Sequence, residues 1–195
     1  MKNLFMPYWM SFIFILLFIS CKEKSNCLSV LQRKNSQLEN LKILSKLQHA
    51  GEGEILKDIY IYKVQDDSIC FSQLLNDFDN IVFFFSEYSC SSCYIPFMKK
   101  ITEKYEELKD KVIIVAGFEN KRDFKIYMED KNFPFTIYRT RKNFSIFPEY
   151  NDYPLAFLTN KNMVIDNLMI IDQSNKEHID DYLSIISKKA MQNSK

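Results

Sequence analysis

Residues 80–100 read NIVFFFSEYSCSSCYIPFMKK, and the rest of the expected architecture is built around them. The run from Ile81 to Phe85 is continuously apolar and rich in β-branched and aromatic residues, which is typical of a strand buried on both faces. Positions 86–89 form a turn, after which Cys90 and Cys93 open a segment with helical spacing. The sequence therefore predicts a strand, a turn and a helix whose first turn carries a Cys-x-x-Cys motif.

The spacing of these two cysteines has a chemical consequence. Residues three apart on a helix share one face, where their sulfurs are close enough to bond. The unpaired N–H groups and the positive end of the dipole at a helix start stabilise a thiolate on the first cysteine. We therefore expect Cys90 to be an exposed nucleophile and Cys93 to be the cysteine that resolves it.

A Cys-x-x-Cys pair has two other interpretations. It can be half of a zinc site, but zinc needs two further ligands in a second pair. The remaining candidate ligands are isolated in the sequence: His49, His178, Cys21, Cys27 and Cys70. It can also be an inert disulfide, although so short a loop constrains the unfolded chain little. The strand-to-helix context favours a redox-active pair, and no metal is expected.

The overall composition excludes some classes of function. The chain has 195 residues, enough for one domain with extensions. Its 26 basic and 25 acidic residues give a net charge of +1, and there are no long runs of Lys or Arg, so nucleic acid is not an expected partner. Five cysteines in a chain of this length do not resemble a disulfide scaffold.

Residues 1–20 have the parts of a secretory signal: Lys2, an apolar run and a small residue, Ser20, before Cys21. This ending resembles a bacterial lipobox, in which the cysteine is lipidated and starts the mature protein, although Phe18 stands where leucine is usual. The alternative is an uncleaved membrane anchor of about the minimum spanning length. In both cases the remaining chain faces the far side of the inner membrane, in the cell envelope, and a lipid on Cys21 would attach it there.

Residues 21–53 are expected to be a polar tether followed by an amphipathic helix. Leucines recur at spacings of three and seven, at Leu28, Leu31, Leu38, Leu41, Leu44 and Leu47. Gly51 and Gly53 stop this helix. Its apolar face can pack on the domain or pair with a second copy as a coiled coil, and the sequence leaves both open. A disulfide between Cys27 and Cys70 is a further alternative.

Residues 54–195 are expected to be one domain of alternating elements. Strands are predicted at 59–64, 69–71, 112–116 and 135–138, helices at about 90–108, 121–130 and 176–190, and a hairpin led by Pro154 at 153–165. Proline is allowed at the first residue of a strand, since its missing N–H falls outside the ladder. Strand and helix in alternation indicate a mainly parallel sheet covered on both faces.

The order of these motifs resembles the thioredoxin fold, an α/β fold with a central mixed sheet and helices on both faces. Over about residues 54–190 it is similar to the membrane-tethered TlpA/ResA-like thiol–disulfide oxidoreductases, here with an N-terminal amphipathic helix and a β-strand extension. The resemblance implies that Pro154 is a cis-proline opposite the disulfide. It also implies that the backbone of Tyr153 pairs with an extended substrate segment.

Several residues depart from the pattern of these relatives. Ser89 stands where most have tryptophan before the first cysteine, and Ser91 and Ser92 fill the motif where many have proline. Phe84 takes the place of the buried acidic residue of thioredoxin. Glu87 is the only nearby carboxylate, so it is the candidate for proton transfer.

The function implied is thiol–disulfide exchange with protein thiols and disulfides, with no cofactor beyond the Cys90–Cys93 disulfide and with a membrane electron donor or acceptor as partner. The direction of electron flow and the reduction potential stay open. One alternative is a non-catalytic surface lipoprotein that binds through the aromatic loop from Phe144 to Tyr153. Another is a peroxide-reducing enzyme.

Overall fold

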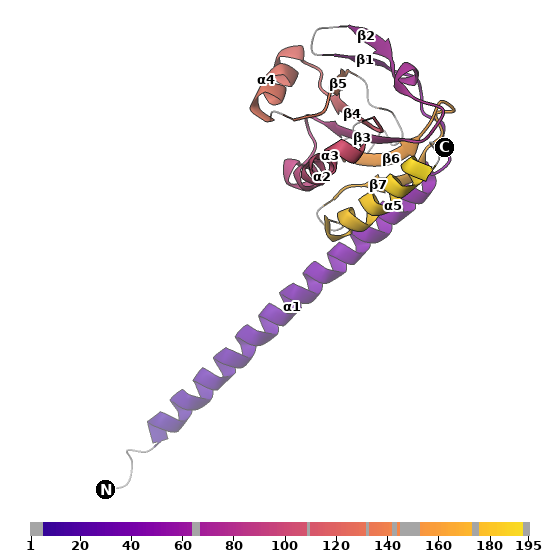
Figure 1. The fold of residues 1–195 in the computed structure, drawn as a ribbon. Helices are drawn as coiled ribbons and strands as arrows, with labels where there is room; N and C mark the ends of the chain where they lie inside the picture. The colour runs from indigo at the N-terminus through magenta and orange to yellow at the C-terminus, as the bar shows by residue number, and fades with distance from the viewer. Residues whose placement is uncertain are drawn as a thin grey trace. The chain divides into compact units, whose positions relative to one another are not determined.

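The computed structural model describes residues 6–63, 67–108, 110–131, 133–141, 144, 153–172 and 176–192 (Figure 1). The chain forms two compact units, 1–42 and 43–195. Of the aromatic loop proposed as a binding surface, only its two end residues, Phe144 and Tyr153, are among the described residues. The side chain of Cys21 also lies outside the described part.

The predicted N-terminal helix is present as α1, which runs from Met6 to Gly51. It begins well before Leu28, the first leucine of the predicted helix. Its end follows the sequence prediction: Gly53 adopts φ +80°, a conformation that glycine takes at little cost. Leu31 and Leu38 are exposed, at 53% and 56%. Within the described residues, no helix has the length and apolarity that a membrane crossing needs.

The last turns of α1 belong to the second unit and are bonded to its sheet. Leu44 is buried there. The Gln48 side-chain amide donates to the carbonyl of Leu168 at 3.0 Å. The carboxylate of Glu52 accepts the backbone N–H groups of Asn167 and Leu168 at 2.9 and 2.6 Å. These bonds fix the start of the folded domain to its edge strand.

The second unit is built on a sheet with the strand order β2-β1-β5-β4-β3-β6-β7. Its strands are β1 (Tyr60–Tyr62), β2 (Ser68–Cys70), β3 (Asn80–Ser86), β4 (Val112–Gly117), β5 (Ile137–Thr140), β6 (Leu155–Thr159) and β7 (Asp166–Ile170). The pairs β3–β4 and β4–β5 are parallel, while the remaining neighbours are antiparallel. The mixed sheet implied by the resemblance is therefore confirmed, with the β1–β2 hairpin as its extension. The expectation of a mainly parallel sheet is wrong, because only the two pairs joined through helical crossovers are parallel.

Strand β3 lies at the centre of this sheet and is buried on both faces, as its composition predicted. Phe83 and Phe85 point into one core cluster, whereas Val82 and Phe84 point into the other. Alternate side chains of a strand face opposite sides, so one five-residue apolar run supplies both cores. This places the end of β3, where the cysteine motif begins, on a rigid support.

Helices cover both faces of the sheet. The first core is covered by α2 (Ser91–Glu103), α4 (Lys121–Lys131) and α5 (Ile179–Gln192). Figure 1 shows α2, α5 and the short α3 (Tyr105–Leu108) on the same side of the sheet. The second core is covered by the last turns of α1 and by the 3-10 helix η1 (Phe71–Leu74). A further 3-10 turn, η3 (Lys176–His178), precedes α5.

Two predicted elements differ from the structure in position. The single helix expected after the cysteines is divided at Lys104 into α2 and α3. The returning strand of the hairpin starts at Asp166, beyond the predicted 163–165. There the chain first makes an Asx turn, in which the side chain of Asn160 accepts the N–H of Asn162 at 3.0 Å, and Met163 takes a positive φ of 58°. The connection between β6 and β7 is therefore longer than predicted, and β7 begins later in the sequence.

Candidate active site

Cys90 and Cys93 are joined by a disulfide at the start of α2, with their Cα atoms 5.3 Å apart. Cys90 is exposed, whereas Cys93 is only 4% exposed. The helix produces this difference because it places Cys90 at the N-cap and turns Cys93 toward the sheet. Cys90 is therefore the accessible cysteine of the pair, and Cys93 is the buried one.

The turn between β3 and the motif is held by two buried serines. The backbone N–H of Ser86 donates to Oγ of Ser89 at 2.9 Å, and the two hydroxyl oxygens lie 3.2 Å apart. The N–H of Ser89 donates in return to the carbonyl of Ser86 at 3.0 Å. Ser89 stands where most of the relatives in the resemblance have tryptophan. It is only 9% exposed, and its hydrogen bonds give it a structural role here.

The first turn of α2 is closed through the backbone of Cys90. Its carbonyl accepts the N–H groups of Cys93 and Tyr94 at 3.0 and 3.3 Å. The side chain of Cys90 makes no capping bond to the helix. Instead, its sulfur lies 3.1 Å from Oγ of Ser92. The exposed sulfur thus has a hydroxyl group as its neighbour.

Aromatic side chains pack around Tyr94, the residue that follows Cys93. Tyr94 stacks on Phe85 with ring centroids 4.7 Å apart, and its hydroxyl donates to that of Tyr127 at 3.2 Å. Burial, and secondarily the hydrogen bond with Tyr94, raises the pKa of Tyr127 well above its usual range. Tyr127 therefore stays protonated at neutral pH, where its hydroxyl accepts the hydrogen bond from Tyr94.

Glu87, the sequence candidate for proton transfer, is half-buried in the same turn. Its carboxylate accepts the backbone N–H of Glu119 at 3.3 Å, and its own N–H donates to the carbonyl of Gly117 at 2.9 Å. Both bonds attach the turn to the end of β4. A structural role is therefore visible for Glu87, while a role in proton transfer stays a prediction.

The expected cis bond before Pro154 is wrong, because the structure has no cis peptide bond among the described residues, which include Tyr153 and Pro154. An X–Pro bond favours trans by only about 0.5–1 kcal/mol, so the isomer depends on tertiary context that a sequence does not reveal. Pro154 is buried and leads into β6, and its carbonyl accepts the N–H of Ile171 at 2.8 Å. Tyr153 is half-buried against the second core.

The sheet register nonetheless brings Pro154 to the same end of the sheet as the disulfide. Phe84 of β3 is paired with Leu155 of β6, so Pro154 lies opposite Phe85. The chain of β3 ends at Ser86 and continues into the turn before Cys90. The cysteine motif and Pro154 thus lie at the same end of the sheet.

Arg139 is a buried charged residue, only 2% exposed, that no pattern in the sequence singled out. Its guanidinium donates to the carbonyls of Phe118 and Glu119 at 3.3 and 3.2 Å and lies over the ring of Tyr62 at 5.0 Å. It fixes the loop that also donates to Glu87. In the sequence, Arg139 directly follows the predicted strand 135–138, and this position does not distinguish a buried arginine from an exposed one.

Two other features bear on possible ligands. Within the described part of the chain, no group of three or more His, Cys, Asp or Glu side chains could hold a metal ion. Cys70 is a free cysteine, so no disulfide joins it to Cys27.

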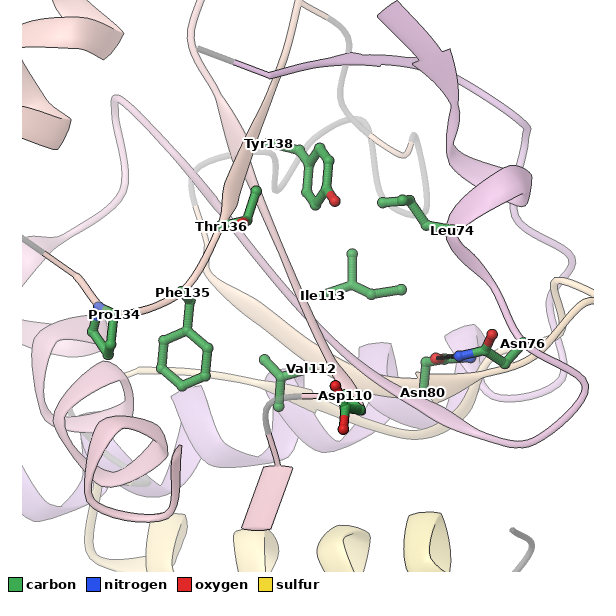
Figure 2. A pocket seen from close by; sticks show the side chains of 10 residues that line it. All are labelled: Leu74, Asn76, Asn80, Asp110, Val112, Ile113, Pro134, Phe135, Thr136 and Tyr138. Carbon is green, nitrogen blue, oxygen red and sulfur yellow. Dashed lines mark hydrogen bonds between the residues drawn. The ribbon is translucent and has the colours of Figure 1, made fainter. Parts of the chain in front are cut away.

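A pocket of about 240 Å³ lies at the opposite end of the sheet from the cysteines. Figure 2 shows Asn80, Ile113 and Tyr138 around it, from the beginnings of β3 and β4 and from β5. Strand β3 separates Asn80 from the turn before Cys90 by about 20 Å, from its rise per residue. The pocket is therefore not part of the cysteine site.

No protein-family model and no curated protein matches this chain. Several solved structures do match in fold. A protein described as thiol:disulfide interchange protein DsbE from Chlorobium tepidum is 15% identical with a TM-score of 0.52, over 70% of this chain and 97% of that one. Peroxidoxin BcpB from Mycobacterium tuberculosis is 12% identical with a TM-score of 0.53, over 71% and 97%.

A third solved structure, described as a protein disulfide isomerase from Bacteroides thetaiotaomicron, is 18% identical with a TM-score of 0.52, over 72% of this chain and 90% of that one. Together with the sheet order, these similarities confirm the predicted thioredoxin fold. The three neighbours carry different activity names on one fold, so activity has to be argued from the residues of the site.

Proposed function

We propose that this protein is a thiol–disulfide oxidoreductase that acts on protein disulfides through Cys90 and Cys93. The observation that carries the proposal is the asymmetry of the pair: a disulfide at a helix start with one exposed and one buried sulfur. An inert structural disulfide has no need of this arrangement, whereas thiol exchange depends on attack at one accessible sulfur. The fold of the neighbouring structures is consistent with it.

The reaction follows from that asymmetry. In the reduced protein, the thiolate of Cys90 attacks a substrate disulfide, forms a mixed disulfide and releases the first substrate thiolate. The thiolate of Cys93 then attacks the sulfur of Cys90, which closes the disulfide seen here and releases the second substrate thiolate. Two electrons pass from the protein dithiol to the substrate. An external dithiol, for which a membrane electron donor is the proposed source, reverses these steps and restores the reduced pair.

The backbone at Tyr153 and Pro154 is the proposed docking edge for the substrate. The register of β3 and β6 supports this, because it brings Pro154 to the end of the sheet where the cysteines lie. Proline has no N–H to pair with a neighbouring strand, so the backbone before β6 can receive an extended substrate segment. The trans bond before Pro154 changes the expected geometry of this edge, not its place in the sheet.

The proposed location is the bacterial cell envelope, with residues 1–20 removed as a signal peptide and a lipid on Cys21. The supporting observation is the sequence pattern of a charged start, an apolar run and Ser20-Cys21. A lipidated cysteine with two or more acyl chains would hold the domain firmly at a membrane surface. An oxidising compartment outside the inner membrane would also supply the disulfides on which the enzyme acts.

The direct test uses the purified full chain in detergent. It should catalyse reduction of insulin disulfides by a small dithiol, and Cys90→Ala should abolish the catalysis. Cys70→Ser is the matched control, since Cys70 is a free cysteine outside the motif. A Cys93→Ser variant expressed in cells should accumulate mixed disulfides with other proteins through Cys90.

Three outcomes separate the alternatives. Activity that survives Cys90→Ala would contradict the proposed mechanism. A wild-type protein with no insulin activity and no trapped partners would favour the non-catalytic binding module. Rapid consumption of peroxide that depends on Cys90 would favour a peroxidase instead.

A further inference from the structure

The middle of α1 exposes large apolar side chains. Every residue from 29 to 40 is exposed, including Val30 and Leu31 at 53% each and Leu38 at 56%. Burial begins only at Leu44, which belongs to the second unit. Most helical stability in proteins comes from packing an apolar face, and an isolated helix is marginal in water. A partner on the leucines of α1 would supply that packing.

The spacing of these leucines is that of a coiled coil. Alternate steps of three and four residues lead along one helix face through Leu28, Leu31, Asn35, Leu38 and Lys42. In a heptad written abcdefg, these are positions a, d, a, d and a. Leucine at d is typical of parallel two-stranded coiled coils, and a single asparagine at a specifies register and oligomeric state. The stripe ends at the last residue of the first unit.

Two charged residues flank the stripe on opposite sides. Lys34 takes position g and Glu39 takes position e, and both side chains are exposed. In a parallel pair of helices, a residue at g faces the residue at e five positions later in the other helix. Lys34 of one copy therefore meets Glu39 of the second copy, and the symmetry of the pair makes this contact twice.

The same two charges have no such contact within one helix. Residues five apart are not neighbours on a helix surface, where only spacings of three and four bring side chains together. Among the described residues, none of the recorded salt bridges includes Lys34 or Glu39. An antiparallel pair would set g against g and e against e, and so like charges together. The complementarity is therefore specific to two parallel copies.

A second stripe of leucines is less suited to pairing. Leu31, Leu38 and Leu41 also lie at spacings of seven and three, but a face through them includes Lys34. Pairing on that face would bury the charge of the lysine at the interface, and an unpaired buried charge is costly. The stripe through Asn35 leaves the lysine at the edge instead, opposite a carboxylate.

We propose that residues 28–42 of α1 form a parallel two-stranded coiled coil with a second copy of this chain. A stripe of about two heptads is short, so a high local concentration favours the dimer. The proposed attachment at Cys21 would provide it, since two chains held on one membrane surface also begin on the same side and run parallel. The pairing does not depend on the chemistry of the cysteine pair.

The test is disulfide cross-linking of the full chain in membranes of cells that express it. The parent chain keeps Cys21 and has its other four cysteines replaced, which sets the background. Leu38→Cys places a thiol at position d, and Asn40→Cys places one at the outward position f. Under mild oxidation, Leu38→Cys should give a species of twice the mass of the chain, whereas Asn40→Cys should match the parent. Both positions are exposed, so neither substitution alters a core.

Reversal of charge gives a second readout. In the Leu38→Cys chain, Lys34→Glu should lower the initial rate of cross-linking by about fivefold, because two exposed ion pairs are lost. Addition of Glu39→Lys to that variant should restore the rate, since opposite charges then face each other again. Arg33→Glu is the matched control, because it makes the same change of charge at position f. It should leave the rate unchanged.

Equal cross-linking of Leu38→Cys and Asn40→Cys, or none in either, would overturn the proposal. A double charge reversal that does not restore the rate would also overturn it. A cross-linked species of another mass would assign the leucine face to a different protein. Because the parent chain lacks Cys90 and Cys93, these outcomes are independent of the proposed thiol exchange.

Discussion

The side-chain carboxylate of Glu87 accepts the backbone N–H of Glu119 at 3.3 Å, which ties the turn before the disulfide to the loop after β4. That loop is held in turn by the buried guanidinium of Arg139, which donates to the carbonyls of Phe118 and Glu119. A carboxylate engaged in this way supports the position of the cysteine motif. Its structural and chemical roles can be separated by substitution.

Glu87→Gln retains an oxygen that can accept the N–H of Glu119. If Glu87 acts only through this bond, the rate of insulin reduction should stay within about twofold of wild type, not fall by the roughly hundredfold that loss of a general acid or base causes. Initial rates measured from mildly acidic to mildly basic pH test this. A large loss in Glu87→Gln together with a changed pH profile would assign proton transfer to Glu87.

Ser89→Ala should destabilise the protein. The substitution leaves the N–H of Ser86 without its side-chain acceptor in a buried turn, and a buried unpaired donor costs about 1–3 kcal/mol. Urea unfolding of the full chain measures the change. Ser91→Ala, two positions along and exposed, is the control and should leave the free energy of unfolding nearly unchanged. A Ser89→Ala protein as stable as the control would show that the serine pair is dispensable.

Tyr127 should make stability depend on alkaline pH. Burial raises its pKa in the folded state, so above about pH 10, the usual tyrosine value, the unfolded chain loses this proton while the folded chain keeps it. Unfolding then releases a proton, and the free energy of unfolding falls as pH rises through this range, while below it the stability is fully present.

Tyr127→Phe should reduce that alkaline slope, whereas Tyr60→Phe, at an exposed position, should not. Urea unfolding at about pH 9 and about pH 11, on either side of the tyrosine value, gives the slope for each variant. Loss of the hydrogen bond from Tyr94 lowers stability equally at both pH values, so it does not affect the comparison. Identical slopes in all three proteins would contradict the raised pKa.

Pro154→Ala tests the proposed docking edge. The carbonyl that accepts the N–H of Ile171 is kept, but the fixed backbone angle of proline and its lack of an N–H are lost. We expect KM to rise for insulin, which has an extended chain to dock, and to stay unchanged for a small aromatic disulfide. Pro134→Ala, at an exposed position on the distant pocket, is the matched control. An equal change with both substrates would remove Pro154 from substrate docking.

Cys21→Ser tests the proposed lipid anchor. In cells fed a radiolabelled fatty acid, the wild-type chain should incorporate label and fractionate with membranes, while Cys21→Ser should incorporate none. Cys27→Ser, six residues further along the same segment, should behave as wild type. Label that persists in Cys21→Ser, or that is lost in Cys27→Ser, would contradict lipidation at Cys21.

Much of this architecture followed from local sequence patterns. The apolar run Ile81–Phe85 is typical of a strand covered on both faces, where all of its side chains are buried. The spacing of Cys90 and Cys93 places both cysteines on the first turn of a helix. The order of strands and helices then pointed to the fold, and the structure bears this out. These inferences hold because burial and helical periodicity are properties of short stretches of chain.

Tertiary structure alone decided the remaining features. The trans bond before Pro154 and the burial of Arg139 and Ser89 depend on which residues distant in sequence are packed around each group. A sequence specifies which donors and acceptors a segment carries. Which of them meet depends on free-energy differences of about 1 kcal/mol, and those are settled only when the strands and helices have packed together.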